Sequence, residues 1–215
     1  MIQLHYYPGN ASIIPHILLE ELGERFELVY VDRTQAAHKA PAYLRLNPNG
    51  LIPVYVEGDL VLYETAAICL HLADTHPQAG FAPALGTPER AHFYKWLAWM
   101  TNTIQAALIL YYYPERWVDD GNAAGAAQVK LHAESKIGAM LEQMDAQLAS
   151  HGRDWFFGER YGALDAYAFI MCRWTRGFAR PARNLKHLGP YLDRMLARPA
   201  VKRVLEKEKL PAPYV

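Results

Sequence analysis

Ser12 is the first residue whose type and position could do chemistry. It follows an apolar stretch, Ile2–Tyr7, and a turn cluster, Pro8-Gly9-Asn10, and it precedes apolar residues at helical spacing. A hydroxyl at a helix start can hydrogen-bond an incoming anion, and the helix end adds a partial positive charge of about half a unit. The residue types leave two interpretations open: a hydroxyl that contacts an anion, or a simple N-cap.

Two later positions could hold a peptide-like ligand. Pro53 opens a predicted strand, where proline indicates a sheet edge, a strand start or a cis peptide bond. A cis bond would turn the N–H and C=O of Ile52 outward to pair with a ligand, and an ordinary turn proline is the alternative. Glu64 and Thr65 precede a predicted helix. The Thr65 hydroxyl and N–H suit a carboxylate and Glu64 suits an ammonium group, or Glu64 only favours the helix N-terminus through its charge.

Amphipathic rings concentrate in one later segment, which contains Trp96, Trp99, Tyr111, Tyr112, Tyr113 and Trp117. These rings either belong to the core or line a pocket for an apolar ligand. The uncharged run within this segment ends at Pro114 and includes threonines, an asparagine, a glutamine and three tyrosines, which would be costly in lipid. We therefore predict a buried helix beside a cleft, and no membrane span.

The first eighty residues predict the elements that must position Ser12, Pro53 and Glu64. Strands are predicted over 2–7, 28–31, 52–56 and 60–62, the last two as a hairpin. Helices are predicted from Ser12 to Gly23, over 40–46 as a short helix, and over 65–75. Because a strand–helix–strand crossover needs parallel neighbours, we expect a mixed sheet with helices on its faces.

The remaining chain has a different pattern. Residues His76–Pro88 hold three prolines and two glycines, which is typical of a linker. Only helices are predicted beyond it, at about 88–113, 123–150, 163–179, 188–197 and 199–208. We therefore predict an α/β domain over 1–77, a linker over 78–87, and an all-α helical domain over 88–215.

The charges exclude some classes of partner. Lys+Arg and Asp+Glu both total 22, so nothing global recruits nucleic acid or a membrane surface. Residues 1–80 hold 9 acids and 4 bases, and residues 81–215 hold 13 acids and 18 bases, which supports two domains of opposite sign. Some bases recur at spacings of three or four, either as a solvated helix face or as a surface attracted to the acidic domain: Arg173, Arg176, Arg180, Arg183 and Lys186.

The chain has two cysteines, Cys69 and Cys172, each within an apolar helical pattern, and we predict buried, reduced core thiols. No CxxC occurs, so neither a self-contained dithiol redox site nor a paired-cysteine zinc site is expected. The first residues lack a basic region followed by a long apolar core. We therefore predict no signal peptide and a cytoplasmic protein.

Three motifs together resemble one known family. They are Leu4–Ser12 (LHYYPGNAS), Asn47–Val54 (NPNGLIPV) and Tyr63–Ile68 (YETAAI), of which the last two are the more specific. The chain resembles the cytosolic glutathione transferases over nearly its whole length, especially the bacterial, beta-class-like members. The segment from Phe157 to Tyr167 is similar to the family's buried capping segment that nucleates its sixth helix.

The resemblance implies a thioredoxin-like domain with a mixed four-stranded sheet and a cis Pro53, and glutathione as co-substrate without a metal. The Ile52 backbone would pair with the cysteinyl unit of glutathione, and Glu64 with Thr65 would hold the γ-glutamyl end. The sulfur would be contacted by Ser12 or Tyr6. The full set of implied glutathione-binding residues is Asn10, His38, Lys39, Ile52, Pro53, Glu64 and Thr65, where His38 or Lys39 would meet the glycyl carboxylate.

The implied activity is conjugation of the glutathione thiolate to an apolar electrophile, a detoxifying transferase reaction carried out by a homodimer. A pocket for this second substrate would be lined by Trp99, Asn102, Tyr111, Tyr112 and Trp117. A glutathione-dependent reductase, dehalogenase or isomerase would use the same glutathione site. A non-catalytic ligand-binding or interaction scaffold is the alternative of another class.

Three positions depart from the pattern of the family. Ala11 stands where beta-class enzymes usually carry a cysteine, so a mixed disulfide with a protein thiol is not expected. Gly162 stands where the helix-six capping box has Ser or Thr, which leaves only Asp165 of that box. Gln105 stands where beta-class members often have a histidine that faces the active site.

Overall fold

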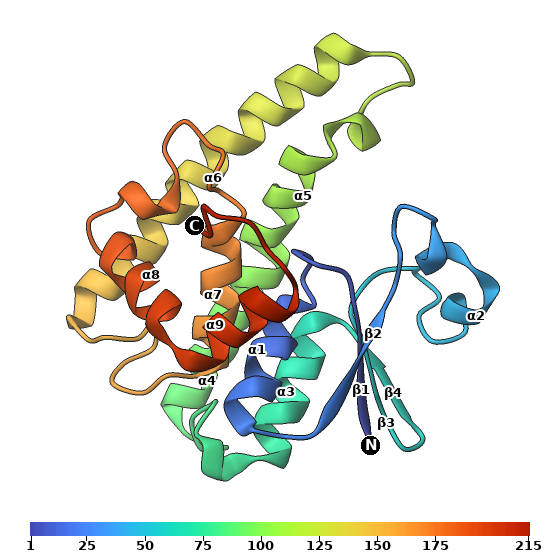
Figure 1. Ribbon diagram of the computed structural model, residues 1–215. Coiled ribbons are helices and arrows are strands. Elements are labelled where there is room, and N and C mark those ends of the chain that lie inside the picture. The colour runs from blue at the N-terminus through green and yellow to red at the C-terminus, as the bar shows by residue number, and fades with distance from the viewer. The chain divides into compact units, whose positions relative to one another are not determined.

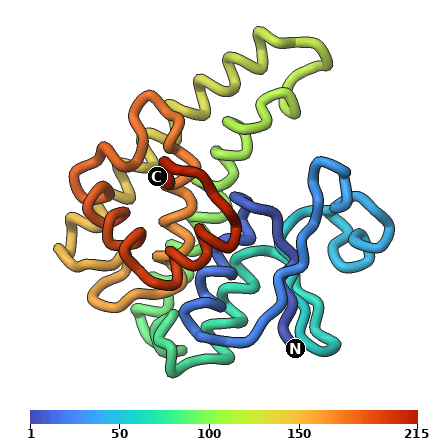
Figure 2. Tube along the Cα trace, viewed as in Figure 1, coloured from blue at the N-terminus to red at the C-terminus, as the bar shows by residue number.

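The computed structural model describes residues 1–215 (Figures 1 and 2). The chain divides into two compact units. The first unit comprises Met1–Ala82 and Leu196–Ala212, and the second comprises Pro83–Met195 and Pro213–Val215. The first boundary lies among the residues predicted as a linker. The C-terminal segment differs from the sequence expectation, which put all of 88–215 into one helical domain, because the last helix packs against the first helix of the chain.

The first unit contains a four-stranded sheet in the order β2-β1-β3-β4. Its strands are β1 (Ile2–Tyr6), β2 (Phe26–Tyr30), β3 (Val54–Glu57) and β4 (Leu60–Tyr63). β1 runs parallel to β2 and antiparallel to β3, and β3 and β4 form the predicted antiparallel hairpin. The predicted mixed sheet is therefore confirmed.

Four α-helices accompany this sheet: α1 (Ile13–Leu22), α2 (Pro41–Leu44), α3 (Thr65–Thr75) and α9 (Pro199–Lys207). α1 is the crossover between the parallel strands, and Gly23 ends it with a φ of 68°, as predicted. Every residue from Ile13 to Glu20 is buried, because α1 contacts both α3 and α9 (Figure 1). α1 is thus an interior helix that carries polar side chains into the core of its unit.

The second unit is helical, as predicted. Its α-helices are α4 (Pro88–Trp99), α5 (Ala106–Tyr112), α6 (Ala123–His151), α7 (Ala163–Arg173) and α8 (Leu188–Ala197), the last of which extends past the unit boundary. Short 3-10 turns cover Pro114–Trp117 and Ala182–Asn184. Not one helix of the chain has both the length and the apolar composition that crossing a bilayer requires.

Two predicted helices differ from those observed, and in both a threonine hydroxyl binds a backbone carbonyl group near the point of difference. The helix predicted over 88–113 is interrupted by a π-helical segment, Met100–Gln105, where the Thr101 hydroxyl donates to the carbonyl oxygen of Ala98 at 2.9 Å. The helix predicted over 163–179 ends at Arg173 instead. There the buried Thr175 hydroxyl donates to the carbonyl oxygen of Cys172 at 2.7 Å and accepts from the Ala182 N–H at 3.0 Å.

The early end of α7 corrects the predicted helical face of basic residues. Only Arg173 lies on the helix, where it is 2% exposed and donates to the carbonyl oxygen of Tyr214. Two of the others pair with local acids outside α7: Arg180 lies 2.5 Å from Glu142, and Arg183 lies 2.8 Å from Asp193. These residues therefore do not form a continuous stripe on one helix.

The start of α7 retains half of a capping box, as the sequence predicted. Gly162 has no side-chain oxygen, but Asp165 accepts hydrogen bonds from the N–H groups of Gly162 at 2.8 Å and Phe156 at 2.7 Å. The Tyr191 hydroxyl also lies 3.1 Å from the Asp165 carboxylate. One buried carboxylate thus ties together three segments of the second unit.

Both cysteines are free and buried, which confirms the predicted core thiols. Burial raises the pKa of the Cys69 thiol. The pKa of Cys172 is raised by burial and, to a smaller extent, by Asp145. Neither sulfur is activated as a thiolate nucleophile, because both are held in the neutral form.

Candidate functional site

The sheet register brings the three predicted ligand-binding segments of the first unit to one edge. His5, Val54 and Tyr63 pair in one row across β1, β3 and β4. The turn before α1 follows shortly after His5, the Ile52-Pro53 segment directly precedes Val54, and the Glu64-Thr65 turn directly follows Tyr63. Because neighbouring strands lie about 4.8 Å apart, the three segments leave the sheet side by side.

Ser12 lies at the start of α1, but its hydroxyl does not cap the helix. The residue has helical angles, φ −55° and ψ −24°, and makes no side-chain cap hydrogen bond, which corrects the predicted N-cap. The buried Ser12 hydroxyl instead donates to the carbonyl oxygen of Tyr7 at 3.2 Å and accepts from the Tyr7 N–H at 3.4 Å. Asn10, in the same turn, accepts from the Ala11 N–H at 2.6 Å through its side-chain oxygen.

Tyr6, the last residue of β1, makes edge-on ring contacts with His16 and Tyr30, with centroids 6.4 Å and 5.9 Å apart. Burial, followed by the charge of Glu208, raises the pKa of the Tyr6 hydroxyl. The hydroxyl therefore keeps its proton at neutral pH and is a hydrogen-bond donor. It is only partly buried, in contrast to Ser12.

The Ile52-Pro53 peptide bond is cis, as the resemblance implied. Ile52 lies before the paired part of β3, which begins at Val54, so the ladder does not use its backbone groups. The preceding carbonyl group is held in place twice: the Leu51 oxygen accepts from the Tyr43 hydroxyl at 2.8 Å and from the Asn47 side-chain amide at 2.9 Å. These two bonds orient the chain as it enters the cis peptide.

The predicted basic residues lie on a short 3-10 turn, Ala37–Lys39, close to Gly50. Gly50 has a φ of +58°, and a Cβ atom there would lie 2.8 Å from both the His38 carbonyl oxygen and the Lys39 ammonium nitrogen. Lys39 donates to the Asn49 carbonyl oxygen at 3.3 Å. Burial, followed by the charges of Arg33 and Lys39, lowers the pKa of His38, so His38 is neutral at pH 7 and Lys39 is the cation of this pair.

Glu64 has an unusual backbone for a residue with a side chain. Its φ is +70° and its ψ is 113°, in a region that non-glycine residues rarely occupy and that often marks a functional site. Glu64 is exposed, whereas Thr65, the first residue of α3, is buried. The helix begins where predicted, and its N-terminus receives no side-chain cap.

The predicted second-substrate residues are only partly brought together. Tyr111 and Tyr112 contact each other with ring centroids 5.2 Å apart, and Tyr111 also packs on Phe178 at 4.3 Å. Trp99 instead packs edge-on against Trp96 at 5.3 Å. Asn102 is exposed, and Trp117 is 50% exposed on its 3-10 turn.

Gln105 and Tyr112 bind within the second unit through strong side-chain hydrogen bonds. Gln105 accepts from the Tyr167 hydroxyl at 2.5 Å, and the Tyr112 hydroxyl donates to the carbonyl oxygen of Trp174 at 2.5 Å. Both bonds join the α4–α5 region to the segment around α7. Gln105 thus has a packing role that its position in the sequence did not reveal.

Sequence reasoning missed three residues that hold the site. Asn47 and Tyr43 fix the Leu51 carbonyl group, and Glu208 accepts from the Gly9 N–H in the turn before α1 at 3.1 Å. Asn47 belongs to the NPNG motif, so its turn-forming residue type was a usable signal. Glu208 had no local signal, since it lies 199 positions after its partner. No group of three or more His, Cys, Asp or Glu side chains is arranged to hold a metal ion.

The chain matches two family models. A model described as "Glutathione S-transferase, N-terminal domain" matches residues 2–74, and one described as "Glutathione S-transferase, C-terminal domain" matches residues 99–199. Glutathione S-transferase GST-4.5 of Xanthomonas campestris pv. campestris is 30% identical over 97% of this chain and 100% of its own length.

Solved structures show the same similarity. One is a glutathione transferase homologue from Sulfitobacter, solved with bound glutathione, with 25% sequence identity and a TM-score of 0.87. The match covers 98% of this chain and 99% of that chain. A bacterial beta class glutathione S-transferase from Sphingomonas chungbukensis is 28% identical with a TM-score of 0.80, over 97% of this chain and 100% of that chain.

Proposed function

Because the chain belongs to the glutathione S-transferase family, we propose that it transfers the thiol of glutathione to an apolar electrophile, with the glutathione site at the sheet edge of the first unit. The observation that carries this proposal is the register of β1, β3 and β4, which sends the Ser12 turn, the cis Ile52-Pro53 bond and the Glu64-Thr65 turn out of one edge. A tripeptide needs contacts at several points along its length, and these segments supply them.

Each segment offers the chemistry that one part of glutathione needs. The backbone of Ile52 lies outside the ladder and suits antiparallel pairing with the cysteinyl unit. Glu64 suits the γ-glutamyl ammonium group, and the hydroxyl and N–H of Thr65 suit its carboxylate. Lys39 is the proposed partner of the glycyl carboxylate, because the neighbouring His38 is neutral at pH 7. Pro53 and Asn10 border the cysteinyl position in this arrangement.

Ser12 is the proposed donor to the sulfur. In the free protein the Ser12 hydroxyl donates to the Tyr7 carbonyl oxygen, with 3.2 Å between the two oxygen atoms. When a thiolate binds, the hydroxyl donates to the sulfur instead. Bonds to charged acceptors are about twice as strong as neutral ones, so the exchange favours the thiolate. Tyr6, which keeps its proton, is the second donor of this turn.

The magnitudes are sufficient for activation without a general base. A free thiol has a pKa of about 8.5, and lowering it by about two units corresponds to about 2.7 kcal/mol. A hydrogen bond to a charged group contributes roughly 1.5–3 kcal/mol and a helix N-terminus roughly 0.3–1 kcal/mol. The thiol proton then passes to solvent, and the sulfur forms a bond to the electrophilic carbon as the leaving group departs with its electron pair.

The test is the pKa of bound glutathione, followed through thiolate absorbance in the ultraviolet. We expect Ser12→Ala to raise this pKa by about one unit, the equivalent of one hydrogen bond to a charged acceptor, while glutathione affinity changes little. Ser150→Ala, at an exposed serine at the end of α6, is the matched control. An unchanged pKa in Ser12→Ala contradicts the role of Ser12, and no binding by the unmodified protein contradicts the proposed function.

The finer parts of the proposal concern the partners. We propose an electrophile held against the rings of the second unit, with Trp99, Asn102, Tyr111, Tyr112 and Trp117 as the residues to vary. Amphipathic rings bind apolar ligands well, and such a pocket supports conjugation in detoxification. A homodimer and a cytoplasmic location stay predictions. Release of halide, of oxidised glutathione or of an isomerised product during electrophile screening would replace conjugation with one of the related reactions.

A further inference from the structure

Glu208 places a carboxylate at the core of the first unit, directly behind the turn that precedes α1. Its side chain is fully buried. One carboxylate oxygen accepts from the Gly9 N–H at 3.1 Å, and the other lies 2.8 Å from Nδ1 of His16. One side chain from the C-terminal segment thus binds both Gly9 in the turn and His16 in α1, seven residues apart.

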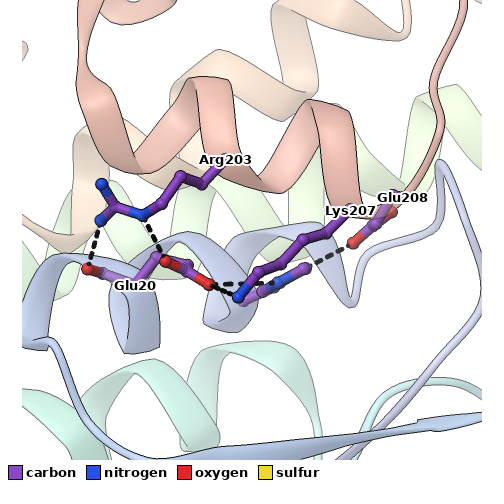
Figure 3. A network of polar contacts seen from close by, with 5 residues as sticks. Glu20, Arg203, Lys207 and Glu208 are labelled. Atoms are coloured by element: carbon purple, nitrogen blue, oxygen red, sulfur yellow. Dashed lines mark hydrogen bonds and ion pairs between the residues drawn. The ribbon is translucent and has the colours of Figure 1, made fainter.

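Other charged contacts lie between α9 and α1, next to Glu208. Figure 3 shows Glu20 of α1 between Arg203 and Lys207, close to Glu208. Glu20 lies 2.6 Å from Arg203 and 2.5 Å from Lys207, and it is 8% exposed. Beyond these contacts, Glu21 receives a two-pronged bond from Arg198 at 2.6 and 2.8 Å. These pairs dock α9 on α1, and Glu208 follows directly after α9.

The docking alone does not explain a buried carboxylate. Burying an ionised group is costly unless hydrogen bonds and a charge partner compensate, and an apolar side chain would join two helices at lower cost. What the carboxylate adds is a contact to the backbone of the turn. Gly9 has a φ of +75°, and Leu210 lies 3.8 Å from the position that a Cβ atom would occupy there, so the C-terminal segment also passes beside the turn.

The contact reaches the residues proposed to meet the sulfur. The turn held at Gly9 begins at Tyr7, whose backbone binds the Ser12 hydroxyl, and it ends at Ser12 itself. Helix α1 is held at His16, one turn further on. Fixing both points fixes where the start of α1 lies relative to the end of β1.

We propose that Glu208 is a positioning residue that holds the Tyr7–Ser12 turn in the geometry needed to stabilise the glutathione thiolate. This inference rests on the proposed function. It extends the site to a residue of the C-terminal segment that does not touch the reacting atoms. Loss of Glu208 therefore impairs thiol activation more than it impairs binding of the glutathione backbone.

The experiment compares four variants of the full-length protein. Glu208→Ala removes both bonds, and Glu208→Gln keeps a side-chain oxygen for the Gly9 N–H and an amide group near Nδ1 of His16. Arg203→Ala weakens the docking of α9 without touching the turn, and Glu206→Ala changes an exposed carboxylate on the same helix. Each variant is measured for hydrogen exchange of the peptide containing Gly9, for the pKa of bound glutathione, and for binding of S-hexylglutathione, which has no thiol.

We expect Glu208→Ala to raise the exchange rate at Gly9 by about tenfold, the size expected for loss of a bond to a charged acceptor. The bound thiol pKa should rise, whereas S-hexylglutathione binding should change less than threefold. Glu208→Gln should restore most of the protection at Gly9 and reverse most of the shift in the thiol pKa. Arg203→Ala should lower thermal stability while leaving the thiol pKa unchanged.

Two results would overturn the inference. One is equal exchange at Gly9 in Glu208→Ala and Arg203→Ala, and the other is a thiol pKa that moves equally in both. If the unmodified protein binds no glutathione, the proposed function and the catalytic consequence of Glu208 both fail. Exchange at Gly9 in the free protein then still decides whether Glu208 holds the turn, so the two failures are distinguishable.

Discussion

The N-terminal ends of α1 and α7 are each held by a carboxylate, but the two carboxylates come from different parts of the chain. Both are buried helix N-termini, and both depend on a buried carboxylate. At α7 the carboxylate is local: Asp165, in the first turn, accepts from the backbone of Gly162. At α1 it is distant: Glu208 accepts from Gly9, outside the helix, and the local hydroxyl of Ser12 binds back to β1.

The difference separates a structural helix start from one that, in the proposed function, serves a ligand site. The carboxylate at α7 satisfies the donors of its own neighbourhood and leaves no side-chain group for a ligand. At α1 the turn is held by Glu208, which binds the Gly9 N–H, and the Ser12 hydroxyl does not cap the helix. The proposed contact between Ser12 and a ligand therefore depends on another part of the chain holding the turn, which is the role proposed for Glu208.

Asp165→Ala should have the largest effect, because it removes the local carboxylate of α7. The N–H groups of Phe156 and Gly162 and the hydroxyl of Tyr191 lose a buried acceptor. We expect the free energy of unfolding to fall by about 3 kcal/mol, measured by denaturant titration. Asp154→Ala, at a carboxylate that is 75% exposed, should change it by less than about 0.5 kcal/mol. A loss below about 1 kcal/mol in Asp165→Ala would show that the cap is not a main source of stability.

The ion pairs of Glu20 that dock α9 on α1 should be sensitive to acid. Burial alone would raise the pKa of Glu20, but the hydrogen bonds and charges of Lys207 and Arg203 outweigh burial and hold this pKa below 4.5. Since the folded pKa is the lower one, this stabilisation is present above the unfolded pKa and is lost as the pH falls through the folded pKa. We expect Glu20→Gln to cost about 1 kcal/mol at pH 7, because its partners are half exposed, and to match the unmodified protein near pH 3.

Denaturant titrations at pH 7, 5, 4 and 3 check this pH dependence. Glu206→Gln, an exposed carboxylate of α9, serves as the control and should leave the profile unchanged. A constant gap between Glu20→Gln and the unmodified protein at all four pH values would mean that the charge of Glu20 does not hold α9 on α1.

Gly162→Ser should have the smallest effect, and it is stabilising. Gly162 has extended angles, φ −151° and ψ −174°, which a serine N-cap adopts without strain. Completing the box with a hydroxyl should add about 0.3 kcal/mol, visible as a small rise in Tm. Gly152→Ser, where φ is +61°, should instead cost about 1 kcal/mol. Destabilisation by Gly162→Ser would mean that the second unit has no room for the missing side chain.

Local signals were enough to predict most elements and part of the local geometry around the candidate site. The bounds of α3 and the glycine that ends α1 agree with the periodicity and turn residues. The cis bond at Pro53 followed from the resemblance, and the residue type alone had left it as one of several readings. What could not be predicted depends on where a side chain points. The Ser12 hydroxyl binds Tyr7 instead of capping the helix, and the Thr175 hydroxyl ends α7 early.

Glu208 is the clearest case of missing information. In the sequence it stands between two lysines near the end of the chain, a pattern typical of a solvated helix. Only the packing of α9 on α1 turns this residue inward, and packing between segments so far apart leaves no local pattern. The same limit applied to the C-terminal segment as a whole, which the sequence assigned to the helical domain.

The membership of Leu196–Ala212 in the first unit has a consequence for biosynthesis. The nascent chain makes β1, α1 and the rest of the sheet early, yet the acceptor for the Gly9 N–H is translated 199 residues later. Contacts of such high sequence separation form late in folding. Until they form, the segments that are already synthesised leave part of their apolar surface exposed. The turn before α1 is therefore synthesised 199 residues ahead of the side chain that holds it, and it reaches its final form only after α9 has docked.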